Sequence, residues 1–157
     1  MARVYLETSF VSACVTDRTD VPSSYRRQVS REWWETQAPR HELWVSQEVL
    51  DELSVSSYRR REAALQWITT VPLLEITEAV IGLAHVLVRE RAMPSPVRGD
   101  AIHLAVAAVY DVEVLVSWNV RHLANINKRM HLRRVCSRCG YTAPEIVTPD
   151  VFWEIQP

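Results

Sequence analysis

Several features that mark other protein classes are scarce in this sequence of 157 residues. It has only three glycines, with no glycine-rich phosphate loop and no G-x-S-x-G motif, which argues against P-loop enzymes and serine hydrolases. Its three cysteines are an odd number and do not suit a disulfide framework. No apolar run approaches the roughly 18 residues that span a bilayer. We expect a cytoplasmic protein that has no membrane partner.

Excess charge of one sign is also missing. The formal net charge is −1, so the chain as a whole does not attract nucleic acid. Arginines do cluster locally, at 26–27, 59–61 and 133–134. Such clusters are ordinarily solvated helix faces, and a polyanionic partner would have to meet one of them as a local patch.

Predicted strands and helices alternate along the whole chain. Short β-branched or apolar runs predict strands at 3–7, 43–46, 71–76, 114–117 and 146–148. Pro72 suits an edge strand, because proline donates no hydrogen bond to a neighbour. Helices are predicted at about 8–15, 24–37, 47–53, 60–69 and 77–91, and from Asp100 onward. This order predicts a single α/β domain over 1–157, with a mainly parallel sheet between helices.

Four polar side chains fall at comparable places in this pattern. Glu7 ends the first strand, Glu52 lies in the helix after the second, Asp100 begins a helix, and Asn119 follows the fourth strand. The carboxyl ends of parallel strands meet at one edge, where ligands bind. Three carboxylates gathered there repel one another unless a cation such as Mg²⁺ or Mn²⁺ neutralises them. Taken singly, each acid is equally compatible with a solvated side chain or a helix cap.

Four motifs together resemble the PIN-domain family, the ribonucleases that include VapC-type toxins. They are YLETS, VSQEVLDEL, GDAIHLAVAAV and LVSWNVRHLAN, and they cover nearly the whole chain in the family's order. The resemblance implies a three-layer α/β/α PIN-like fold with a mainly parallel central sheet. It also implies an endoribonuclease dependent on Mg²⁺ or Mn²⁺, the toxin of a type II toxin–antitoxin pair. The implied partners are an RNA substrate, a cognate antitoxin and a second copy of the chain.

The resemblance assigns the catalytic positions to Glu7, Glu52, Asp100 and Asn119, the first three as metal ligands. Two of them depart from the family's acidic pattern. Glu7 stands where the family has aspartate, so its carboxylate reaches about 1.5 Å further. Asn119 also replaces an aspartate, which removes a negative charge and keeps an oxygen. Three acids favour one divalent ion over two. The alternative is a catalytically weak or inactive PIN-like domain that binds RNA or protein.

Further residues receive supporting assignments. The hydroxyls of Ser9 and Ser117 would support the acids, and His103 lies one turn after Asp100, where it is either a cleft residue or a packed histidine. Candidates for substrate contacts are Arg121, His122, Arg59 and Arg60.

Two other features have competing interpretations. Trp118 is either a base-stacking platform or a core residue. The C-x-x-C pair Cys136 and Cys139 lacks the second pair that a zinc site requires.

Overall fold

The computed structural model describes residues 1–154, in which five strands alternate with helices. The strands are β1 (Arg3–Leu6), β2 (Glu42–Ser46), β3 (Leu73–Leu74), β4 (Val114–Val116) and β5 (Glu145–Val147). The helices are α1 (Thr8–Val15), α2 (Val21–Thr36), α3 (Gln47–Leu53), α4 (Arg61–Trp67), α5 (Glu78–Arg89), α6 (Asp100–Val109) and α7 (Arg129–Arg138). Short 3₁₀ turns lie at Ala38–Arg40, Ile126–Lys128 and Pro149–Val151. The predicted order of strands and helices is confirmed.

All the strand pairs are parallel, in the order β3-β2-β1-β4-β5. The chain first builds the sheet outward from β1 to β2 and β3. It then returns to the other side of β1, where β4 pairs with Leu6 opposite Val116. The direction of winding therefore reverses between β1 and β4, and in open parallel sheets ligands bind at the carboxyl end of such a switch point.

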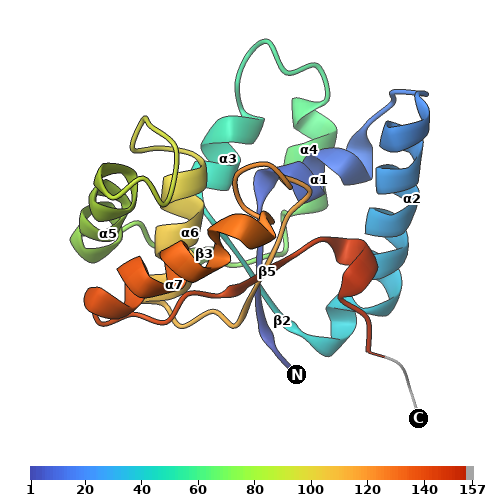
Figure 1. Cartoon of the computed structure of the whole chain (residues 1–157). Helices are drawn as coiled ribbons and strands as arrows, with labels where there is room; N and C mark the ends of the chain where they lie inside the picture. The colour runs from blue at the N-terminus through green and yellow to red at the C-terminus, as the bar shows by residue number, and fades with distance from the viewer. Residues whose placement is uncertain (155–157) are drawn as a thin grey trace.

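Helices cover both faces of the sheet (Figure 1). Helix α1 packs against α2 and α4 in one layer, and α5 packs against α6 and α7 in the other. The short helix α3 contacts both α1 and α6, which places it at the carboxyl edge of the sheet between the layers. Within residues 1–154, no helix has the length and apolar character needed to cross a membrane.

Several element boundaries differ from the prediction by a residue or two, and those of α2 and β3 differ most. Helix α2 begins at Val21, where the proline-containing segment predicted a turn up to Ser24. Asp20 caps this helix by accepting from the backbone N–H of Ser23 at 3.2 Å, and Pro22 is tolerated in a first helical turn. Strand β3 is only two residues long, and it is the predicted edge strand.

The fold prediction that we draw concerns the central strands. Leu115 of β4 is fully buried, whereas Leu73 of the edge strand is 48% exposed. We expect Leu115→Ala to lower the free energy of unfolding by about 2–5 kcal/mol, because it removes buried surface and leaves a cavity. Leu73→Ala is the matched control and should cost less than about 1 kcal/mol. Urea denaturation measures both, and equal effects would contradict the observed strand order.

Candidate metal-dependent active site

Glu7 lies at the switch point, immediately after β1, and its side chain is buried with 4% exposure. Its Oε2 atom caps α1 by accepting from the backbone N–H of Ser9 at 3.0 Å. The hydroxyls of Ser9 and Ser117 donate to the same oxygen, the latter at 2.7 Å. Three donors therefore hold Oε2, and the other oxygen, Oε1, is left to face the neighbouring polar groups.

The two serine hydroxyls are themselves held in one orientation by the backbone. Ser9 Oγ accepts from the N–H of Trp118 at 2.8 Å, and Ser117 Oγ accepts from the N–H of Asn119 at 2.9 Å. Because each hydroxyl already accepts a backbone proton, its own proton is free to point at Glu7. The predicted supporting serines are thus both in contact with the predicted first acid.

Glu52 extends from α3 toward the same point and is half-buried. Thr8 Oγ1 donates to its Oε1 at 2.8 Å, and His103 Nε2 contacts the same oxygen. Burial opposes ionisation of this carboxyl. The contacts with His103 and Thr8 outweigh that effect, so the pKa of Glu52 lies below its ordinary value.

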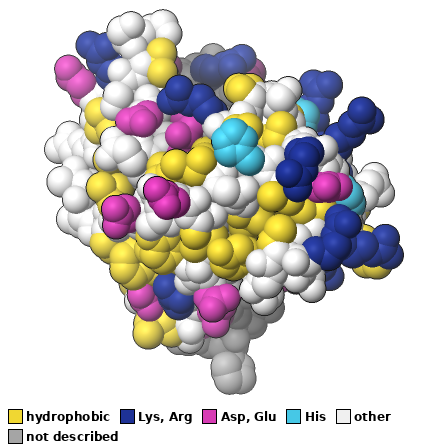
Figure 2. All heavy atoms as spheres, turned by 90° about the vertical axis from the view of Figure 1, so that its left-hand side faces the viewer, with side chains coloured by type: hydrophobic (Ala, Val, Ile, Leu, Met, Phe, Trp, Pro, Cys, Tyr) yellow, Lys and Arg dark blue, Asp and Glu magenta, His cyan; other side chains and the backbone are white. Residues whose placement is uncertain are grey.

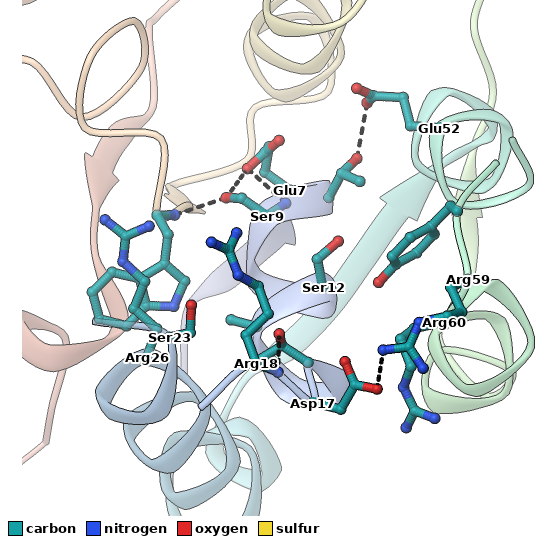
Figure 3. A pocket seen from close by; sticks show the side chains of 15 residues that line it. Glu7, Ser9, Ser12, Asp17, Arg18, Ser23, Arg26, Glu52, Arg59 and Arg60 are labelled. Atoms are coloured by element: carbon teal, nitrogen blue, oxygen red, sulfur yellow. Dashed lines mark hydrogen bonds and ion pairs between the residues drawn. The ribbon is translucent and has the colours of Figure 1, made fainter. Parts of the chain in front are cut away.

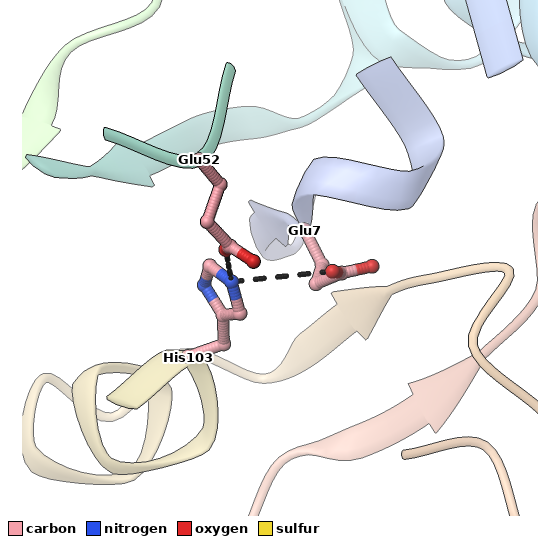
Figure 4. A group of neighbouring side chains, drawn as sticks. All are labelled: Glu7, Glu52 and His103. Atoms are coloured by element: carbon pink, nitrogen blue, oxygen red, sulfur yellow. Dashed lines mark hydrogen bonds and ion pairs between the residues drawn. The ribbon is translucent and has the colours of Figure 1, made fainter. Parts of the chain in front are cut away.

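His103 projects from α6 between Glu7 and Glu52, and it is fully buried (Figure 4). Its Nε2 lies 3.9 Å from Glu7 Oε1, and its Nδ1 lies 2.7 Å from the hydroxyl of Tyr5. Burial disfavours the charged imidazole, but the hydrogen bond to Glu52 and the charge of Glu7 raise the pKa of His103 above its usual value. The histidine is therefore part of the acidic cluster.

Asp100 begins α6 and contacts Asn119, the residue that stands in the fourth acidic position. The Asn119 side-chain amide donates to Asp100 Oδ1 at 3.0 Å, and its Oδ1 accepts from the backbone N–H of His122 at 3.1 Å. Burial, assisted by the charge of Glu52, raises the pKa of the Asp100 carboxyl above its ordinary value. Both ends of the Asn119 amide are thus engaged, and an aspartate could not make the contact to an ionised Asp100.

Glu48 supports the site through the backbone. Its side chain is buried, and its Oε1 accepts from the N–H of Gly99 at 2.8 Å. Gly99 adopts a φ of +54°, a conformation that favours glycine, directly before Asp100. Glu48 thereby fixes the start of α6. Glu48 and Glu52 are four residues apart and therefore share one face of α3. Glu48 contacts the backbone before α6, and Glu52 contacts the cluster.

The carboxylates offer oxygen ligands that suit a hard divalent cation. Within residues 1–154, no hydrogen-bond donor reaches Glu7 Oε1, Glu52 Oε2 or Asp100 Oδ2. Ligand atoms of Glu7, Glu52 and His103 all lie within 4.8 Å of one another. Carboxylate oxygens of this kind suit Mg²⁺ and Mn²⁺. Asp100 is adjacent to this group through its contact with Asn119 and is not a member of it.

A cleft of about 600 Å³ opens from Glu7 and Glu52 along α1 (Figure 3). Four arginines line it: Arg18, Arg26, Arg59 and Arg60. Arg59 forms an ion pair with Asp17, and Arg60 Nε donates to the carbonyl of Val15 at 2.9 Å. Arg18 likewise pairs with Asp20, at 3.3 Å. We call these four arginines the basic wall of the cleft.

Trp118 holds one of these arginines in place. The Arg26 guanidinium lies over the indole ring, 5.4 Å from its centroid, and the indole N–H donates to Ser30 Oγ at 2.7 Å. Trp118 is buried, and Arg26 covers its face, so the structure favours the core interpretation over an open base-stacking platform.

The remaining predicted residues are dispersed. Arg59 and Arg60 line the cleft, but Arg121 does not, and His122 contributes its backbone N–H to Asn119. Burial raises the pKa of the Cys136 thiol to about 11, and neither Cys136 nor Cys139 belongs to a metal-like cluster within the described residues.

Tyr5, Thr8 and Ser46 were not among the predicted site residues, and Arg26 was predicted only as a member of an arginine cluster. Only Tyr5 carried a usable signal, since a buried tyrosine requires a partner for its hydroxyl.

No protein-family model matches the sequence, and a search of curated proteins finds no similar sequence. Solved structures of toxin–antitoxin proteins are similar in fold. VapBC2 from Rickettsia felis bound to a DNA fragment from its promoter has a TM-score of 0.60 and 12% identity, over 96% of this chain and 98% of that one. A toxin–antitoxin complex from Klebsiella pneumoniae has a TM-score of 0.60 and 19% identity, over 97% and 99%.

A third similar structure is VapC20 from Mycobacterium tuberculosis, a toxin that cleaves the sarcin–ricin loop. Its TM-score is 0.57 at 19% identity, over 90% of this chain and 99% of that one. At sequence identities this low, the structural similarity establishes the fold alone. The chain has the three-layer, parallel-sheet PIN-like fold that its motifs predicted.

The contact between Asn119 and Asp100 gives a prediction about charge. We expect Asn119→Asp to lower the metal-free stability at pH 7 by about 1–3 kcal/mol, because a hydrogen-bond donor is replaced by a second carboxylate. The loss should shrink at acidic pH, where the carboxyls are protonated. Asn127→Asp, at an exposed position, is the control. Urea denaturation without metal measures both, and equal stabilities would show that Asn119 does not support Asp100.

Proposed function

We propose that this chain is a divalent-metal-dependent endoribonuclease that hydrolyses RNA phosphodiesters, as the toxin of a type II toxin–antitoxin pair. The observation that carries the proposal is the meeting of Glu7 and Glu52 at the β1–β4 switch point, with Asp100 at the adjoining start of α6. Within residues 1–154, each of these acids has one carboxylate oxygen that no hydrogen-bond donor reaches. In the proposal, these three side chains hold Mg²⁺ or Mn²⁺ at a single site. When bound, such an ion activates water and offsets charge on the phosphodiester.

The surrounding residues have separate tasks in this proposal. Ser9 and Ser117 keep the Glu7 carboxylate in one orientation, so that little reorganisation is needed when substrate enters. Asn119 orients Asp100 through its amide. The basic wall of the cleft binds phosphates on the RNA strand and leaves the acidic cluster to the scissile group.

The partners in the proposal are an RNA substrate, a cognate antitoxin and a second copy of the chain. Support for RNA comes from the similar toxin that cleaves the sarcin–ricin loop, and support for the antitoxin from the similar toxin–antitoxin assemblies. Neutralisation by a partner also suits the open cleft, because a bound polypeptide would cover the arginines and the acids together.

The alternative is a PIN-like domain that binds RNA or protein without cleaving it. The contact of His103 with Glu52 favours this alternative, since the imidazole supplies positive charge within the acidic cluster. Among the salt bridges of residues 1–154, no arginine reaches Glu7, Glu52 or Asp100, so no fixed cation seals the site.

The first functional prediction concerns Asp100→Asn. Folding raises the pKa of the Asp100 carboxyl, so the ionised group destabilises the fold at pH values above its unfolded pKa. The neutral amide of Asp100→Asn should therefore give a metal-free stability at pH 7 equal to or higher than that of the wild type. Cleavage of a fluorescent RNA with Mn²⁺ should fall by about 100-fold or more, because a metal ligand is lost.

Asp51→Asn, at an exposed position on α3, is the control and should retain wild-type cleavage. A stable Asp100→Asn protein that cleaves as fast as wild type would remove the mechanism. Metal-independent RNA binding by a wild-type protein that never cleaves would support the alternative.

The second functional prediction concerns Arg26, which we test in the Asp100→Asn background so that RNA stays intact. Arg26→Gln should weaken binding of single-stranded RNA several-fold and reduce the log–log salt slope by about 0.7, the value for one lost phosphate contact. Arg134→Gln, at an exposed position of α7 outside the cleft, is the control. Fluorescence anisotropy across a salt series measures both, and identical salt slopes would exclude Arg26 from the RNA interface.

A further inference from the structure

The position of His103 is unusual for a histidine that only packs in the core. It is fully buried, yet its Nε2 faces two carboxylates, contacting Glu52 and lying 3.9 Å from Glu7 Oε1. Glu7 is itself 4% exposed, and within residues 1–154 its Oε1 accepts no hydrogen bond. His103 Nε2 and the buried Glu7 Oε1 therefore face each other across a short gap.

The other side of the imidazole is held by a buried chain of hydroxyl groups. His103 Nδ1 lies 2.7 Å from the Tyr5 hydroxyl, and the same hydroxyl lies 2.7 Å from Ser46 Oγ. Tyr5 and Ser46 are both fully buried. Metal-binding histidines almost always use their second ring nitrogen in this way, donating N–H to an acceptor that fixes the ring and its tautomer.

We propose that His103 is a direct ligand of the divalent ion through Nε2, so that the site is a mixed carboxylate–imidazole centre that selects Mn²⁺ over Mg²⁺. In this arrangement Nε2 releases to solvent the proton that it directs at Glu52 in the structure, Nδ1–H donates to Tyr5, and the Tyr5 hydroxyl donates to Ser46. Imidazole nitrogen favours transition-metal ions, whereas Mg²⁺ prefers oxygen ligands alone. The inference rests on the metal site of the proposed function and goes beyond its carboxylate ligands.

The observed spacing is compatible with such a centre. Ligand atoms about 2.2 Å from one ion lie about 3 Å apart when adjacent and about 4.4 Å apart when opposite. The candidate atoms of Glu7, Glu52 and His103 already lie within 4.8 Å of one another. Glu52 has to leave its contact with Nε2 so that this nitrogen can face an ion. Glu52 is the most exposed of the three side chains, which gives it room for that shift.

The test uses Mn²⁺ alone as the probe, on the whole chain, with pulsed electron paramagnetic resonance as the readout. The wild-type protein should show coupling between Mn²⁺ and a ¹⁴N nucleus, and His103→Gln should lose it. Titration should give a fall of about 10–100-fold in Mn²⁺ affinity for this variant, a much smaller change for Mg²⁺, and thus a lower Mn²⁺/Mg²⁺ selectivity. His85→Gln, at an exposed position on α5, is the matched control and should keep the coupling.

Tyr5→Phe tests metal ligation with little effect on folding, because it keeps His103 and the buried aromatic ring of residue 5. It should retain the nitrogen coupling while Mn²⁺ affinity falls, since the acceptor for Nδ1–H is lost. Bound Mn²⁺ without ¹⁴N coupling in the wild-type protein would overturn the inference, as would the absence of Mn²⁺ binding at millimolar concentration.

RNA cleavage is measured separately. Nitrogen-coupled Mn²⁺ in a protein that cleaves no RNA would support the inference and reject the proposed function. RNA cleavage by a protein whose bound Mn²⁺ shows no ¹⁴N coupling would support the proposed function and reject the inference about His103.

Discussion

The burial of the Glu7 carboxylate is the constraint on which the rest of the site depends. A buried charge is costly unless hydrogen bonds replace its lost hydration, and here every donor comes from an element that meets at the β1–β4 switch point. Ser9 belongs to α1 and Ser117 follows β4, while the backbone after Ser117 fixes both hydroxyls. The one carboxylate therefore ties the first helix to the fourth strand. A displacement of β4 relative to β1 would remove the Ser117 donor and the Trp118 contact that orients Ser9. Fold and site are in this sense one hydrogen-bonded unit.

Much of this unit was predictable because it lies at the ends of strands. The alternation of strands and helices located Glu7, Glu52, Asp100 and Asn119, and the family resemblance added Ser9 and Ser117. The start of α2 was wrong, since Pro22 was interpreted as a turn residue although Asp20 caps a helix there. Arg26 was predicted only as a member of an arginine cluster, because on its own helix it resembles any solvated arginine. Its position depends on Trp118, which is brought beside it by the fold. Contacts of this kind depend on tertiary packing, which periodicity does not contain.

The distribution of charge explains how a protein with a net charge of −1 can have a site for a polyanion. Acidic groups lie at the strand ends and arginines line the adjoining cleft, so the opposite charges are separated over a short distance. Burial, assisted by the charge of Glu52, raises the pKa of Asp100, whereas the contacts with His103 and Thr8 lower the pKa of Glu52. His103 compensates part of this charge within the cluster. Shifts of opposite direction on neighbouring acids are found more often at functional sites than among solvated surface acids.

Asn119 shows why a missing acid need not mean a decayed site. An amide has a donor as well as an acceptor, and here both are used, the donor by Asp100 and the acceptor by the backbone of His122. An aspartate in its place could ligate a second cation but could not orient an ionised Asp100, and it would add repulsion to a cluster that already has three acids. The asparagine therefore exchanges a ligand for a positioning contact. Together with His103, which contacts Glu52, this asparagine lowers the negative charge gathered beside the strand ends.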